Sequence, residues 1–248
     1  MFDAVVARKA RLISIIDGVG KQPREDLITS TLFGTLRFLL PEARAKALRV
    51  ICDHKFVGDV QIHLWPFFRG NGKSAEPDVV LEFNREGQRA YWIVEVKWGA
   101  ALGEDQAERE IIMVKSGSCR RGNIVEGMRN LVGYTLLGAE KKHQKTLEEL
   151  ELKYFQEHAI KNISWKATCD SLRQLADTEP DPGLIAWARL AADFLAGEPQ
   201  GFVLGPWPEM KTPGECRFLF DDENNFQLKA FPAVIPTTYF FRETDDQH

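Results

Sequence analysis

The chain of 248 residues has 44% hydrophobic and 27% charged residues, a composition that is ordinary for a folded globular protein and excludes disordered and fibrous classes. Its net charge of −4 argues against a surface coated in positive charge for non-specific nucleic-acid binding, but leaves room for a local basic groove. The four cysteines form no C-x-x-C pair and the five histidines no H-E-x-x-H spacing, so we expect no zinc site and a reducing cytoplasm.

The first 140 residues are predicted to form a helix, three strands, an interrupted helical segment and a further strand. Helical spacing of apolar residues, strand-like alternation and turn residues define them. In chain order they are a helix at 25–41 that ends at Pro41, strands at 60–64, 78–83 and 91–97, helices at 103–117 and 123–131 around a loop at 116–123, and a buried strand at 131–138.

This order predicts an α/β core in residues 1–140. Residues 141–248 are expected to form an extension of helices and short strands that packs on the core. Its expected elements are helices at 141–162 and 183–197 and strands at 201–207, 216–220 and 226–231. No apolar run approaches the ~20 residues that cross a bilayer, and residues 1–18 lack the pattern of a signal peptide, so no membrane role is expected.

The most informative pattern lies in the strands at 78–83 and 91–97. A two-residue turn at Glu86-Gly87 would join them as a hairpin, because Gly tolerates positive φ. On that register Asp78 lies opposite Glu95, with Cβ atoms roughly 4.5 to 5.5 Å apart, and Lys97 follows on the same face. Two carboxylates this close repel each other, and a divalent metal ion would relieve the repulsion directly.

Pro77-Asp78, followed across the hairpin by Glu95-Val96-Lys97, resembles the signature of the PD-(D/E)XK nuclease superfamily. The element order over roughly residues 25 to 140 is also similar to the αβββαβ core of that family. The resemblance implies a restriction-endonuclease-like α/β fold, with a mixed sheet flanked by helices. It further implies that Asp78 and Glu95 bind Mg²⁺, for which Mn²⁺ can substitute, and that Lys97 helps to activate the attacking water and stabilises charge on the phosphate.

The same resemblance implies roles at the site for three further residues. The carbonyl of Val96 would complete the metal shell, and Glu25 occupies the place of an acidic residue that such nucleases often take from the first helix. Gln106 matches a glutamine that many members carry on the helix after the third strand, often as Q-x-x-x-Y, where it contacts nucleic acid. The chain departs from that pattern because Glu110 stands in place of the tyrosine.

Each of these residues also has a structural interpretation. The hairpin would then lie at the edge of the sheet with one solvated face, where charges deter pairing with other strands. That interpretation would also expose Tyr91 and Ile93, which favours the catalytic one. Glu25 is equally explained by the helix dipole in a first turn, and Gln106 by an exposed helix position.

A basic segment follows the predicted helix at 103–117. Within residues 111–130, four basic side chains face only Glu126, which gives a local charge of +3; they are Lys115, Arg120, Arg121 and Arg129. The first three are predicted to hold phosphates of a nucleic-acid backbone. A solvated loop explains the same charges equally well.

These features together predict a Mg²⁺-dependent deoxyribonuclease that hydrolyses phosphodiester bonds. By resemblance it is an endonuclease in restriction or anti-phage defence, with DNA as its substrate and a second copy or a defence protein as its partner. The alternative is a nuclease-fold binding or assembly subunit of a larger nucleic-acid-processing complex, with no activity of its own. Nothing in the sequence separates DNA from RNA, because recognition of the 2′-hydroxyl leaves no short motif.

Overall fold

The computed structural model describes most of the first four fifths of the chain and three short strands near its end. The described residues are 24–98, 102–103, 105–138, 143–155, 159–197, 218–220, 226–228 and 240–241. The chain divides into two compact units, Met1–Phe202 and Val203–His248. Residues 141–202, which we assigned to an extension, therefore lie in the same unit as the predicted core.

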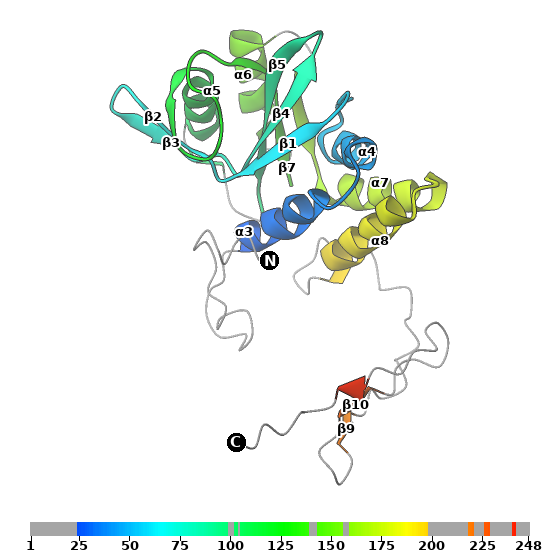
Figure 1. Ribbon diagram of the computed structural model, residues 1–248. Coiled ribbons are helices and arrows are strands. Elements are labelled where there is room, and N and C mark those ends of the chain that lie inside the picture. Colours follow the sequence, from blue (N-terminus) through cyan, green and yellow to red (C-terminus); the bar gives the residue numbers. More distant parts are fainter. Residues whose placement is uncertain are drawn as a thin grey trace. The chain divides into compact units, whose positions relative to one another are not determined.

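A five-stranded mixed sheet forms the centre of the first unit, with strand order β1-β4-β5-β7-β8 (Figure 1). Strand β4 runs antiparallel to both β1 and β5, whereas β7 runs parallel to both β5 and β8. The bounds are β1 Val60–Leu64, β4 Val79–Arg85, β5 Gln88–Val96, β7 Asn130–Leu137 and β8 Ile160–Ile163. Both strands of the predicted hairpin, β4 and β5, thus lie inside the sheet.

The hairpin has the register that the sequence predicts. Val79 pairs with Val94 at one end and Arg85 with Gln88 at the other. Glu86 and Gly87 in the turn have φ angles of 55° and 78°, as a two-residue turn matched to the twist of the strands requires. The edge-hairpin interpretation is wrong, because β1 covers one side of the hairpin and β7 the other.

The helices of the first unit flank both faces of the sheet. They are α3 Arg24–Thr29, continued by the π-helical segment η1 Ser30–Gly34, then α4 Pro41–Cys52, α5 Gln106–Ser116, α6 Gln144–Tyr154, α7 Trp165–Thr178 and α8 Pro182–Gly197. One expectation is wrong here: Pro41 begins α4 instead of ending the helix at 25–41. The physical reason is that proline lacks an N–H and fits the first turn of a helix, where that N–H would have no partner.

Residues 118–131 and 160–163 also differ from the expectation. Residues 118–121, predicted as a loop, form β6 (Ser118–Arg121), and residues 160–162, the end of the helix predicted at 141–162, lie in β8. The helix expected at 123–131 is not formed: Gly122 and Gly127 have φ angles of 116° and 107°, outside the helical region. Helix α7 was not predicted.

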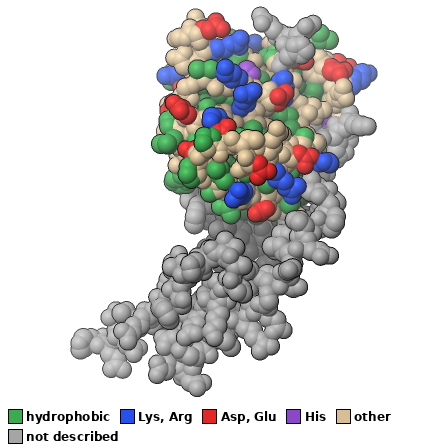
Figure 2. All heavy atoms as spheres, turned by 90° about the vertical axis from the view of Figure 1, so that its right-hand side faces the viewer, with side chains coloured by type: hydrophobic (Ala, Val, Ile, Leu, Met, Phe, Trp, Pro, Cys, Tyr) green, Lys and Arg blue, Asp and Glu red, His purple; other side chains and the backbone are tan. Residues whose placement is uncertain are grey.

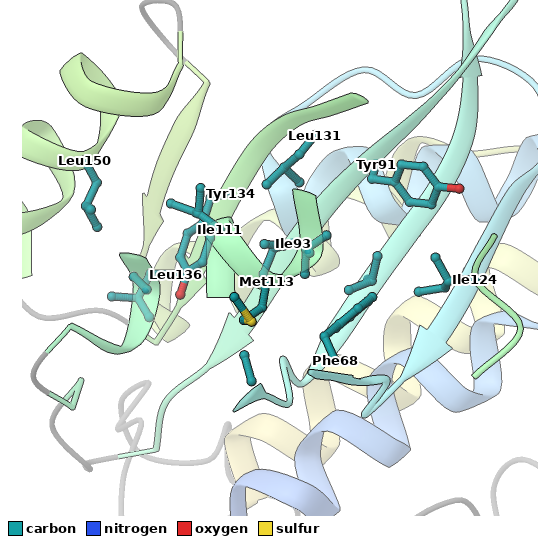
Figure 3. Packing of buried hydrophobic residues seen from close by; sticks show 14 of the residues in the cluster. Phe68, Tyr91, Ile93, Ile111, Met113, Ile124, Leu131, Tyr134, Leu136 and Leu150 are labelled. Atoms are coloured by element: carbon teal, nitrogen blue, oxygen red, sulfur yellow. The ribbon is translucent and has the colours of Figure 1, made fainter. Parts of the chain in front are cut away.

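The core on the α5 side of the sheet contains the apolar residues that share a face with the predicted charges (Figure 3). Ile93 from β5 and Tyr134 from β7 lie against Ile111 and Met113 of α5, and Leu150 of α6 completes this layer. On the other face the Trp92 indole donates a hydrogen bond of 2.9 Å to Thr135, whose hydroxyl donates to the Cys52 carbonyl of α4 at 3.4 Å. The sheet is therefore covered on both sides.

A small antiparallel sheet of order β3-β2-β6 lies beside α5. It consists of β2 Phe67–Gly70, β3 Lys73–Ala75 and β6. Its inner face packs through Phe68 and Ala75 into the core on the α5 side. In Figure 1 the β2–β3 hairpin extends past α5.

The second unit contains three described strands in the order β11-β10-β9: β9 Phe218–Phe220, β10 Phe226–Leu228 and β11 Phe240–Phe241. All neighbours are antiparallel. The first two overlap the strands expected at 216–220 and 226–231, and the strand expected at 201–207 lies outside the described residues. None of the helices in the described part of the chain is long and apolar enough to cross a membrane.

We expect Gly133→Ala to destabilise the first unit by roughly 1 to 3 kcal/mol, because overpacking a core costs about this much. A Cβ atom at position 133 would lie 2.1 Å from the ring of Trp92. Gly70→Ala is the matched control, since a Cβ there makes only ordinary contacts, and it should change stability by less than about 1 kcal/mol. Urea denaturation of both variants measures the difference, and equal midpoints would contradict the close packing of Trp92 on β7.

Candidate active site

Asp78 and Glu95 lie together at one end of the β4–β5 hairpin. Asp78 immediately precedes β4, and its Oδ2 accepts a hydrogen bond of 2.9 Å from the Val96 N–H. The Glu95 Oε2 atom lies 3.5 Å from the backbone nitrogen of Asp78. The pairing register that brings the two carboxylates together is therefore the predicted one.

Lys97 lies beside these two carboxylates, and both its side chain and its backbone have close partners. Its Nζ lies 2.8 Å from Glu95 Oε1, and the residue is only 7% exposed. Its N–H donates to the Leu137 carbonyl and its own carbonyl accepts from Trp165 Nε1, each at 2.8 Å. Gly138 is required beside it, because a Cβ there would lie 2.0 Å from the Lys97 carbonyl oxygen. These contacts fix the backbone of Lys97, which limits where its ammonium group can lie.

Glu25 reaches the same site from the first turn of α3. Its Oε2 lies 3.6 Å from Lys97 Nζ, and its Oε1 accepts a hydrogen bond of 2.9 Å from the Trp98 N–H. The structure thus brings the α3 carboxylate to the hairpin, although its place in a first turn also satisfies the helix-dipole interpretation.

Gln106, at the start of α5, lies inside the site and bridges two carboxyl groups. Its Nε2 donates to Glu95 Oε1 at 2.6 Å and to Glu110 Oε1 at 2.9 Å, while its Oε1 accepts from the Gly103 N–H at 3.1 Å. The Tyr134 hydroxyl donates to Glu110 Oε2 at 3.0 Å. This chain of hydrogen bonds runs from Glu95 through the core to β7.

Glu110 and Tyr134 are site residues that the sequence analysis did not identify. The spacing of Gln106 and Glu110, four residues apart on one helix face, was the available signal for Glu110. No local signal marks Tyr134, because its contact with Glu110 joins residues 24 positions apart.

Burial dominates the electrostatics of the cluster. Desolvation, followed by repulsion from Glu95, raises the pKa of Asp78 well above its usual value. Desolvation also raises the pKa of Glu95, although Lys97 opposes the shift. Burial disfavours the charged form of Lys97, but attraction from Glu95 outweighs it and raises the pKa of the ammonium group. Lys97 is therefore cationic at neutral pH.

The donor set fits a divalent cation in its charge and chemistry. Four carboxyl groups (Glu25, Asp78, Glu95, Glu110) lie around the single ammonium group of Lys97. Carboxylate oxygens are ligands that Mg²⁺ accepts, with waters in its remaining positions. Across the described ranges, however, no three His, Cys, Asp or Glu side chains are placed so that they could hold one metal ion together. Asp78, Glu95, the Val96 carbonyl and Glu25 therefore stay predicted ligands.

The basic residues lie apart from this cluster, in and around β6. Arg121 forms an ion pair with Glu76 and donates from Nε to the Trp65 carbonyl at 3.2 Å. Arg120 is exposed and Lys115 is half-buried on α5. Arg129, which contributes to the local charge of +3, is buried and donates to the carbonyls of Val125, Val114 and Gly117, which anchors the loop to α5.

We expect Glu110→Gln to become more stable relative to the wild type as pH rises. Burial, then repulsion from Glu95, raises the pKa of Glu110 well above its usual 4.5, so the folded state keeps a proton that the unfolded chain has lost. Wild-type stability therefore falls as pH rises from 4.5 through the folded-state pKa, with a slope of up to about 1.4 kcal/mol per pH unit. Glutamine cannot ionise and removes this contribution.

Urea denaturation in EDTA from about pH 5 to pH 8 measures this difference, over the range in which such groups ionise. Glu149→Gln, at an exposed position on α6, is the control and should follow the wild-type curve. Parallel pH profiles for Glu110→Gln and the wild type would contradict the burial of an ionisable Glu110.

Comparison with known proteins adds no further constraint: no family model, no curated protein and no solved structure matches this chain.

Proposed function

We propose that this protein is a metal-dependent nuclease that hydrolyses phosphodiester bonds in DNA. The observation that carries the proposal is the cluster of half-buried Asp78 with buried Glu95 and Lys97 at the end of two interior strands. Isolated buried charges destabilise a fold, so a cluster with excess carboxyl groups in this position is typical of a functional site. The order helix, three antiparallel strands, helix, parallel strand supports a restriction-endonuclease-like αβββαβ core.

In the proposed reaction, a bound cation and the residues of the chain would have different roles. Asp78 and Glu95 would hold a divalent ion, which would supply an acidified water molecule and polarise the scissile phosphate. Lys97 offsets the negative charge that develops on the phosphate, and Glu95 holds its ammonium group in place. Gln106 donates a hydrogen bond of 2.6 Å to Glu95 Oε1, the same oxygen that Lys97 contacts, and so helps to hold this carboxylate in place.

Lys97 acts as a cation in this scheme. Its pKa is raised by Glu95, Glu25 and Asp78, so it does not accept a proton from water at neutral pH. Its contribution is electrostatic, and its preorganised position means that little reorganisation is needed as charge develops.

The biological setting follows from the family resemblance alone. We propose an endonuclease in restriction or anti-phage defence, working with a second copy of the chain or with a defence protein. Cutting both strands of a duplex often uses a symmetric dimer, which favours the second copy.

Purified protein should cut DNA in the presence of Mg²⁺ or Mn²⁺ but not in EDTA, and Lys97→Ala should reduce the rate by roughly a hundredfold or more, as the loss of one preorganised electrostatic group does. Gel assays on circular and linear duplex DNA, single-stranded DNA and RNA measure this and identify the substrate. Lys145→Ala, at an exposed site on α6, should retain full activity. Unchanged cutting by a folded Lys97→Ala protein would reject the catalytic assignment.

Divalent ions should stabilise the wild type through the carboxylate pair, by about 2.7 kcal/mol when the ion is present at a hundred times its Kd. Asp78→Asn keeps the side-chain shape but removes the charge, and should abolish the stabilisation. Thermal unfolding with Mg²⁺, Mn²⁺ or EDTA measures the effect, with Asp193→Asn on the exposed face of α8 as the control. A wild type that shows neither metal-dependent stabilisation nor cutting would favour the binding or assembly subunit instead.

A further inference from the structure

The β3-β2-β6 sheet concentrates positive charge in a protein that is acidic overall. Residues 67–76 and 115–129, which contain this sheet and its flanking segments, include six basic residues and two acidic ones, whereas the whole chain carries −4. Arg129 is one of the six, but its guanidinium group donates hydrogen bonds to carbonyl groups in the core. The other basic residues are half-buried or exposed.

Strand register places three arginines on the outer face of this sheet. Phe68 pairs with both Ala75 and Cys119, and all three pack against the core, so their neighbours point outward. Arg69 pairs with Ser74 and with Ser118, and an irregularity in β6 makes Arg120 and Arg121 together oppose Phe67. We call the outward residues the arginine face: Phe67, Arg69, Ser74, Ser118, Arg120 and Arg121.

Two arginines of this face have no acidic partner in the described part of the chain. Arg69 and Arg120 are exposed, and no ion pair or side-chain hydrogen bond of either is found among the residues that the structure describes. Elsewhere the surface differs: Figure 2 shows Lys and Arg interspersed with Asp and Glu on the side that includes α4 and α7. On α4, for example, Lys46 pairs with Glu179 and Arg44 with Asp59.

Arg121 links the arginine face to the segment that leads into Asp78, through Trp65 and Glu76. Arg121 donates to the Trp65 carbonyl at 3.2 Å, and the Trp65 N–H donates to the Asp78 carbonyl at 2.9 Å. Arg121 also pairs with Glu76, two residues before Asp78. A ligand held on the face is thus held by the same short segment that positions Asp78.

We propose that the arginine face binds the phosphate backbone of double-stranded DNA and presents it to the Asp78–Glu95 site. Arginine and serine side chains supply the phosphate contacts that position a protein on a duplex. The face offers one half-buried aromatic ring, Phe67, and no series of exposed rings on which the bases of a single strand would stack. This inference deepens the proposed function and rests on it for the identity of the substrate.

The test is DNA binding in EDTA, measured by fluorescence anisotropy with a short labelled duplex between about 50 and 200 mM salt. The Arg69→Ala/Arg120→Ala double variant should bind more weakly, and its plot of log affinity against log salt should be flatter by about two, one for each lost phosphate contact. The control is Arg49→Ala/Arg85→Ala, which removes two exposed arginines from α4 and the hairpin tip and should match the wild type.

Equal slopes for the wild type and the Arg69→Ala/Arg120→Ala variant would overturn the inference, as would an equal loss in the control or a wild type that does not bind. Single-stranded DNA of the same sequence that binds as tightly as the duplex would overturn the duplex assignment. Because binding is measured without metal ions, the two proposals fail separately. Arginine-dependent binding without cleavage would reject the nuclease alone, and cleavage with unchanged binding by the double variant would reject the arginine face alone.

Discussion

The ion pair between Lys97 and Glu95 is the interaction on which the rest of the site depends. Both groups lie at the end of an interior strand, where water is largely excluded and a lone charge would be strongly destabilising. The surrounding structure is arranged to hold this pair: Trp165 and Leu137 fix the Lys97 backbone, and Gln106 fixes the carboxylate. Gly138 leaves the space that this packing needs.

The Lys97–Glu95 ion pair neutralises only part of the negative charge of the cluster. Asp78 and Glu110 also lie in the cluster, and burial raises the pKa of both. Without a second cation, the folded state accommodates them by holding protons or by hydrogen bonds from Val96, Gln106 and Tyr134. Buried charged groups at these positions are destabilising relative to apolar residues, and a bound cation, as proposed above, would relieve this cost.

Particular residues show how far prediction from the sequence reached. The hairpin register followed from Gly87 and the alternation of apolar residues, and it placed Asp78 against Glu95 as observed. Pro41 was misassigned because a proline can end one helix or begin the next, and apolar spacing does not distinguish the two. The strand β6 was missed because its pairing with β2 joins residues about fifty positions apart, and its polar sequence has no strand-like alternation.

The sequence by itself determined the α/β class, the hairpin and the residues of the carboxylate pair, because these depend on side-chain periodicity and a turn between neighbouring segments. The tertiary structure decided that the hairpin is interior, that Glu25, Gln106, Glu110 and Tyr134 join one cluster, and that three arginines share one face. These features arise from contacts between distant segments. Such contacts are set by packing of the whole core, which no local pattern encodes.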